Sequence, residues 1–154
     1  MVRWELTNVA NDYLRFSEKI MNLTQKEYAW LLRVFKTVID DMDPNELKAF
    51  AAELELTPED LEWGWPGFSY SFEDAGKALW IYSDEYANVE NLGAFLHSFM
   101  KVTGRKDYIA VTWAETCDKP RIGAFGGGVL LVTAKTYVVE SSWSRLGKLI
   151  KEHL

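Results

Sequence analysis

The hydrophobic pattern of this chain changes its period at one turn, Gly64-Trp65-Pro66-Gly67. Before the turn, apolar residues recur about every 3.6 residues, which is typical of helices packed along one side. After the turn, Phe68, Tyr70 and Phe72 alternate with polar residues, which indicates a half-buried strand. Helices followed by strands in this order favour an α+β fold over a doubly wound one.

Local signals place the expected helices before the turn. Thr24 and Glu27 have the spacing of a capping box, in which each side chain accepts a hydrogen bond from a free backbone N–H group. Asp43-Pro44 starts another helix, because proline is tolerated at the first helical position. The expected helices run from Thr7 to about Met21, from Thr24 to near Asp41, from Asp43 through Leu54 and, as a short piece, from Thr57.

The second part of the chain has the order β-β-α-β-β followed by a helix. We expect strands at Phe68–Glu73, Ala78–Ser83, Tyr108–Glu115 and, unusually long, Gly128–Glu140; a helix between Asn88 and Gly104; and a short C-terminal helix containing Trp143. The pattern predicts a mostly antiparallel four-stranded sheet. A length of 154 residues fits a single domain, 1–154, with a helical portion at 1–63 and a sheet portion at 68–154.

The cysteine count and the hydrophobic runs favour a cytoplasmic protein. The single cysteine, Cys117, forms no internal disulfide, which fits a reducing compartment. The first residues lack the apolar stretch of a secretory signal, and the longest apolar run, Gly127–Thr133, is too short to cross a bilayer. We therefore expect no membrane partner.

Negative charge is concentrated in one helical segment. It holds nine acids and one base, Lys48: Asp40, Asp41, Asp43, Glu46, Glu53, Glu55, Glu59, Asp60 and Glu62. The segment nets −8 while the whole chain nets −6, which leaves +2 for the remainder. Such a face attracts a basic partner and repels DNA and RNA, unless it is only a solvated helix surface. We expect no direct nucleic-acid binding, and exposed Trp63 and Trp65 would anchor a protein partner.

The most distinctive stretch of the sequence contains Trp113-Ala114-Glu115-Thr116-Cys117, Lys119-Pro120-Arg121 and Phe125-Gly126-Gly127-Gly128. It resembles a stretch in uncharacterised small proteins of phages and other mobile elements, over about Ala78 to Trp143. The resemblance implies a setting, that of mobile-element accessory proteins, many of which inhibit host defences. It implies no catalytic residue and no established activity.

The same stretch also allows a ligand site. Three glycines carry a backbone-entropy cost of about 0.5–1 kcal/mol each relative to alanine, so they indicate a bulge, a positive φ or a close approach. A bulged hairpin satisfies this requirement without any ligand. Alternatively, Gly126, Gly127 and Gly128 give a small molecule or nucleotide access to the backbone, with Trp113, Glu115, Lys119 and Arg121 lining the pocket.

No pattern of catalytic or metal-binding residues stands out. Cys117 needs a nearby base to become a nucleophile, and the two histidines, His97 and His153, fit a packed position and a chain terminus better. One cysteine and two distant histidines give no zinc spacing, and the acids match no Ca²⁺ loop. We expect no metal and no cofactor.

Two hypotheses from different classes follow. The first is a non-enzymatic acidic binding protein, an accessory or anti-defence factor that docks on the basic, nucleic-acid-binding surface of a host protein. The second is a small-ligand or nucleotide-binding domain, with or without enzymatic activity, whose pocket lies on the sheet near Gly126–Gly128. A homodimer formed through an open edge of the sheet is a third option.

Overall fold

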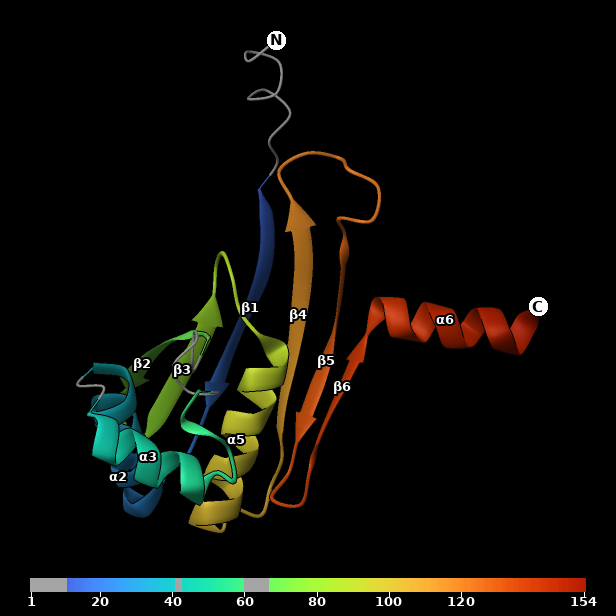
Figure 1. Cartoon of the computed structure of the whole chain (residues 1–154). Helices are drawn as coiled ribbons and strands as arrows, with labels where there is room; N and C mark the ends of the chain where they lie inside the picture. The colour runs from blue at the N-terminus through green and yellow to red at the C-terminus, as the bar shows by residue number, and fades with distance from the viewer. Residues whose placement is uncertain (1–10, 41–42, 60–66) are drawn as a thin grey trace, which may run out of the picture.

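A computed structural model describes residues 11–40, 43–59 and 67–154, without the side chains of 37–39. It contains a six-stranded antiparallel sheet in the order β2-β3-β1-β4-β5-β6, with helices α2 and α5 against one face (Figure 1). The strands are β1 (Asp12–Ile20), β2 (Ser69–Glu73), β3 (Ala78–Ser83), β4 (Ile109–Cys117), β5 (Gly126–Val132) and β6 (Tyr137–Ser141). The α+β class is confirmed, with six strands where four were expected.

The described helical segments lie between the strands and after the last strand. They are α2 (Gln25–Val34), the π-helix η1 (Phe35–Asp40), α3 (Pro44–Glu53), the 3₁₀ turn η2 (Asp74–Gly76), α5 (Val89–Thr103) and α6 (Ser142–His153). The expected capping box is present at the start of α2: Thr24 Oγ1 accepts from the backbone N–H of Glu27, and the Glu27 carboxylate accepts from that of Thr24. Asp43 caps α3, and Gly104 ends α5 at φ 76°.

The expected first helix is wrong for residues 12–20, which form the strand β1; Thr7 and its neighbours lie outside the described residues. This strand pairs with β3 on one side and β4 on the other, so it is the third strand of the six. Its apolar residues also fit a period of two, with Phe16 and Ile20 buried on one face. Backbone pairing to two distant strands therefore outweighs the local helical pattern.

The long fourth strand expected over 128–140 is two strands. β5 ends at Val132 and β6 begins at Tyr137, and the two are antiparallel neighbours. The turn between them is closed by Thr133, whose hydroxyl accepts hydrogen bonds from the backbone N–H groups of Lys135 and Thr136, each at 3.2 Å. A hydroxyl closes this turn, which contains none of the usual turn residues Gly, Pro, Asn and Asp.

The core lies between the sheet and the helices on one face. Trp30 of α2 contacts Phe50 of α3 and both Phe95 and Phe99 of α5, with ring centroids 5.8–5.9 Å apart. Phe35 of η1 stacks on Tyr70 of β2 at 3.7 Å. The helices before Gly64–Gly67 therefore pack with the sheet residues in one continuous core.

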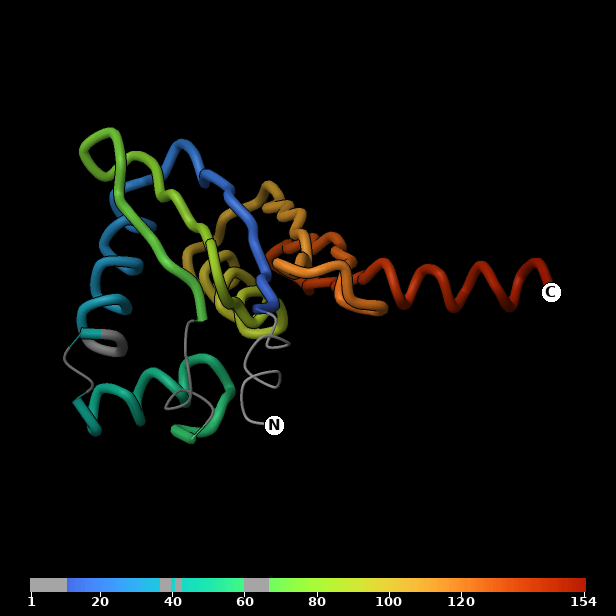
Figure 2. The backbone as a smooth tube through the Cα atoms, turned by 90° about the horizontal axis from the view of Figure 1, so that it is seen from above, coloured from blue at the N-terminus to red at the C-terminus, as the bar shows by residue number. Residues whose placement is uncertain are grey.

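One end of that sheet face extends beyond the helices. In Figure 1, α5 lies beside the lower part of β4, while the upper ends of β1 and β4 rise past it. Helix α6 leaves the sheet after β6 and projects sideways from the body, as both views show (Figures 1 and 2). None of its residues is buried. No helix in the described ranges is long and apolar enough to span a membrane.

Candidate functional site: the end of the sheet at the glycine run

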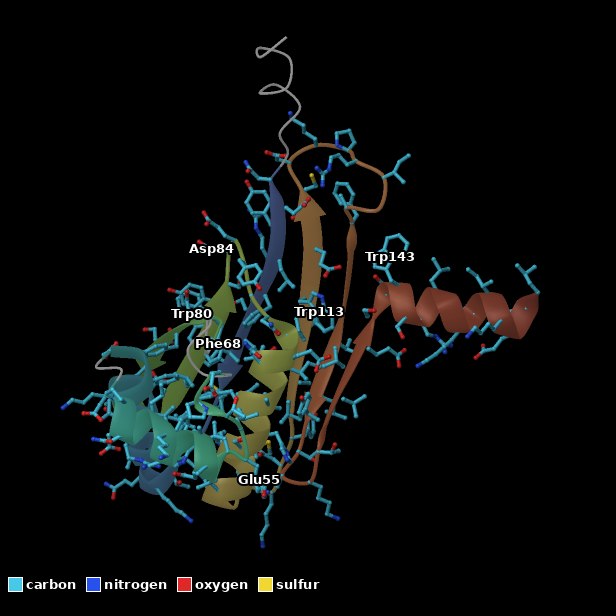
Figure 3. The ribbon with its side chains drawn as sticks, in the orientation of Figure 1. Glu55, Phe68, Trp80, Asp84, Trp113 and Trp143 are labelled. Atoms are coloured by element: carbon cyan, nitrogen blue, oxygen red, sulfur yellow. The ribbon has the colours of Figure 1, made fainter. Side chains whose placement is uncertain are left out.

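Trp113 lies two residues before Glu115 on β4, and both side chains point to the helix-covered face of the sheet. Alternation along β4 leaves Thr112 and Ala114 exposed and Trp113 only 8% exposed. The register pairs Trp113 with Gly128 and Glu115 with Gly126. The indole of Trp113 is thus inside the fold, with little of its ring open to a ligand (Figure 3).

The glycine run makes room for this tryptophan. A Cβ atom on Gly128 would collide with the six-membered ring of Trp113, and one on Gly127 would collide with the backbone oxygen of the same residue. Close approach of β4 and its side chain is therefore a sufficient reason for glycine at both positions. An anion cradle is not needed to explain them.

Gly126 has a different environment, which is polar. A Cβ atom there would lie 2.9 Å from Oε2 of Glu115, 3.0 Å from Nε1 of Trp143 and 3.1 Å from Oγ of Ser142. The hydroxyl of Ser142 accepts a hydrogen bond from the backbone N–H of Gly127 at 3.1 Å. The first turn of α6 is therefore fixed to the glycine run, on the same face of the sheet as Glu115.

A cavity of about 340 Å³ lies next to this cluster, between the ends of β1 and β4 and two loops. Its walls come from the β3–α5 loop and the β4–β5 loop, and they combine apolar groups with charged ones. The charged lining residues are Asp12, Glu85, Glu115 and Arg121, and the apolar ones include Leu14, Ala87 and Ile122. Its volume falls in the range of small-molecule pockets, about 300–1,000 Å³.

Two contacts lie near the Asp12 end of the cavity, one an ion pair and the other a pair of hydrogen bonds. Arg121 lies 3.2 Å from the Asp12 carboxylate, which balances one of the acids in the lining. Asp118 holds the β4–β5 loop to the start of β1, because its carboxylate accepts from the backbone N–H of Asn11 at 2.9 Å and from its amide at 3.2 Å. Glu85 and Glu115 make no ion pair within the described ranges.

Of the residues expected to line a ligand pocket, Glu115 and Arg121 meet at this cavity, and the remaining ones do not line it. Trp113 is buried, and Lys119 is not a lining residue; its backbone oxygen accepts a hydrogen bond from the backbone N–H of Arg121 at 2.8 Å. No sequence pattern pointed to Asp12 and Glu85, since both come from segments far from Glu115 along the chain. Asp12 also lies in the stretch expected to be helical.

The acidic segment is only partly described: Asp41, Asp60, Glu62, Trp63 and Trp65 lie outside the described residues. Among the others, Glu53 contacts Arg33 at 3.0 Å and accepts from Trp30 Nε1 at 3.1 Å. Glu55 lies 3.7 Å from Lys101. Part of the negative charge is therefore balanced by neighbouring bases.

The remaining acids of the segment face solvent. Asp40, Asp43, Glu46 and Glu59 are exposed, and they make no ion pair with a described base. The carboxylate of Asp43 accepts from the backbone N–H groups of Asn45 and Glu46, so it serves α3 as well as the surface. Asp40 adds to burial, the larger cause, in raising the pKa of the Tyr70 hydroxyl.

The nucleophile and metal candidates are dispersed. His97 Nδ1 lies 2.9 Å from the backbone oxygen of Thr133, and its ring packs beside Tyr137. Cys117 is half-buried, with its thiol 3.9 Å from the Asp118 carboxylate. Within the described ranges no three His, Cys, Asp or Glu side chains gather in a way that could hold a metal ion.

Comparison of this chain with protein-family models, with curated proteins and with solved structures found no match.

Proposed function

We propose that this protein is a non-enzymatic, acidic binding protein of phage or mobile-element origin, which inhibits a host protein by docking on its basic, nucleic-acid-binding surface. The observation that carries the proposal is the exposed, unpaired set of acids around α3: Asp40, Asp43, Glu46 and Glu59. Like charges gathered on one surface speed association with a basic partner, and this effect weakens with salt.

Two neighbouring ion pairs reduce the number of acids that contribute to the negative surface. Because Glu53 and Glu55 already have Arg33 and Lys101 beside them, they contribute little net field. The docking surface is therefore formed by the unpaired acids Asp40, Asp43, Glu46 and Glu59. The two ion pairs lie at its edge, where the negative charge is neutralised.

A charge-reversal experiment tests this surface. Glu46→Lys with Glu59→Lys changes two exposed acids, and Asp84→Lys with Glu152→Lys makes the same change in net charge elsewhere on exposed positions. The wild-type protein and both variants are immobilised and incubated with a lysate of the candidate host at low and high salt. Captured proteins are identified, and displacement of labelled DNA from each is measured.

The proposal expects salt-sensitive capture of a nucleic-acid-binding protein and displacement of its DNA by the wild type and by the Asp84/Glu152 variant. The Glu46/Glu59 variant is expected to lose both by at least tenfold. Equal capture by the two variants contradicts the proposal. So does capture that leaves the DNA bound.

The cavity supports a second function, a small-ligand or nucleotide-binding domain. Glu115 and Arg121 both line it, and its size suits a small polar molecule. A thermal-shift screen of nucleotides tests this function, with Arg121→Ala as the variant and Lys135→Ala, an exposed base in the β5–β6 turn, as the control. A stabilising nucleotide whose effect is lost only in Arg121→Ala supports the function, and a screen without any shift rejects it.

A further inference from the structure

Helix α6 carries an apolar stripe that the described residues leave about half exposed. Trp143, Leu146 and Ile150 are spaced three and four residues apart, so they share one side of the helix, and they are 46–52% exposed. A helix of twelve residues is marginal in water unless its apolar side is packed. The stripe therefore requires a partner surface.

The stripe starts on the helix-covered side of the sheet. Trp143 approaches Gly126 on the face that carries Glu115, and it lies at the root of the projecting helix (Figure 3). Two further apolar side chains on the β4–β5 loop are exposed, Ile122 fully and Phe125 to 48%. Ile122 also lines the cavity, so we assign it to that recess. We call the other four residues the arm surface: Phe125, Trp143, Leu146 and Ile150.

The same molecule has a recess that, like α6, combines apolar and charged side chains. At the end of the sheet beyond α5, the 340 Å³ cavity offers apolar Leu14 and Ala87 together with the carboxylates of Glu85 and Glu115. Arg121 lines the same cavity but pairs with Asp12, and these two carboxylates make no ion pair in the described residues. They would pair with cations delivered by an incoming surface.

Helix α6 brings such cations. Arg145 and Lys151 lie on α6 outside the apolar stripe, and neither makes an ion pair with a described acid, whereas Lys148 lies 3.6 Å from Glu140. Long basic side chains keep their charge at the rim while their carbon stems cover apolar surface. A helix with an apolar side and unpaired basic residues thus fits a recess that combines apolar side chains with the carboxylates of Glu85 and Glu115.

We propose that the arm surface docks on a second copy of this chain, with the α6 helix of each copy lying over the cavity end of the other copy's sheet. Because the projecting helix and its complementary recess are on one molecule, a two-fold axis satisfies both contacts at once and closes the assembly. A specific interface buries about 800 Å² on each partner. In the reciprocal arrangement each copy contributes both a helix and a recess to that area.

This inference is independent of the acidic surface around α3, and it places a protein segment where the second candidate function places a small ligand. It also differs from a dimer formed by pairing the free edges of two sheets. Edge pairing would use the backbone of β2 or β6, and it would tolerate substitution of the α6 side chains.

The test measures the mass of the full chain in solution by light scattering and sedimentation over a range of concentrations. The chain has a mass of 17.7 kDa, and the wild type is expected at twice that mass. Leu146→Lys with Ile150→Lys is expected to raise the dissociation constant at least a hundredfold. The control is Val129→Lys with Val138→Lys, which alters side chains of similar exposure, 51% and 54%, on the opposite face of the sheet.

Two further readouts separate docking from misfolding. None of the α6 residues is buried, so the Leu146/Ile150 variant is expected to keep the thermal transition of a monomeric core. Amide exchange in residues 142–153 is expected to speed up at least tenfold in this variant, because the uncovered helix opens. Glu115→Lys is expected to weaken the dimer. A second variant, which combines Arg145→Glu and Lys151→Glu, is expected to restore association when it is mixed with the first.

Several outcomes overturn the proposal. They are a wild-type chain that stays at 17.7 kDa at every concentration, a dimer that survives Leu146→Lys with Ile150→Lys, and a dimer that the Val129/Val138 control breaks equally. A monomeric wild type that binds lipid vesicles through α6 would assign the stripe to a membrane surface instead.

Discussion

The indole of Trp113 lies against the backbone of Gly128, its antiparallel neighbour on β5. A methyl group at Gly128 has no space there, because the carbonyl oxygen of Glu140 on β6 lies on the other side. This contact explains why β5 has a glycine at this position. It also sets how closely β4, β5 and β6 approach beside the cavity.

The first prediction concerns this contact. Gly128→Ala is expected to lower the free energy of unfolding by about 1–3 kcal/mol, because the added methyl overpacks the site. Gly147→Ala is the control, since a Cβ there meets no atom within 4 Å. Within α6, that change is expected to leave stability unchanged or raise it by up to about 1 kcal/mol. Chemical denaturation of both variants checks the pair, and equal effects would contradict the contact.

The second prediction concerns the ion pair between Glu27 and Arg105, whose charged atoms are 3.0 Å apart and whose side chains are 7% and 12% exposed. Arg105→Met leaves the Glu27 carboxylate buried without its cation, so we expect a loss of about 3–5 kcal/mol in the free energy of unfolding.

The matched control for that pair is Lys101→Met, which breaks the exposed contact with Glu55. It is expected to cost at most about 1 kcal/mol. Urea denaturation of the two variants measures the difference. If both variants lose the same stability, the buried pair does not hold α2 to the chain after α5.

The third prediction concerns alkaline pH. Burial, with Asp40 as a second cause, raises the pKa of Tyr70 above its ordinary 10.0, and burial together with Glu90 does the same for Tyr137. Above pH 10 the unfolded chain then releases protons that the folded chain retains, so stability is full below this pH and falls as the pH rises through the folded values.

Tyr70→Phe with Tyr137→Phe is expected to reduce this alkaline loss, because neither position can ionise. Denaturation midpoints at pH 8 to 11 measure the loss in each protein. The control is Tyr108→Phe, at a side chain 67% exposed, which is expected to keep the wild-type dependence. A loss of equal size in all three proteins would show that other groups cause it.

The fourth prediction separates the two roles of Asp43. Its carboxylate caps α3, so Asp43→Ala is expected to lower the stability of the folded chain by about 0.5–2 kcal/mol. Asp43→Asn removes the charge but keeps a capping oxygen. Its loss of stability is therefore expected to be only a few tenths of the loss caused by Asp43→Ala. Amide exchange in residues 44–53 and partner capture by the two variants distinguish the cap from the docking charge.

Features that depend on neighbouring residues could be predicted from the amino-acid sequence. The capping box of Thr24 and Glu27, the start of α3 at Asp43-Pro44 and the left-handed end of α5 at Gly104 all need only a few adjacent residues, and all are present. The hairpin of β2 and β3 belongs to the same class, because its alternation and its turn are local.

Features that depend on residues far apart along the chain are visible only in the folded protein. β1 is a strand because β3 and β4 supply hydrogen bonds on both of its sides, which no local period reports. The cavity brings together Asp12, Glu85 and Arg121, which lie far apart along the chain, so the sequence does not show that they are close in space. Helix α6 was predicted from its pattern, but its projection from the body depends on how the chain leaves the last strand, since a pattern specifies which side of a helix is apolar and not what covers it.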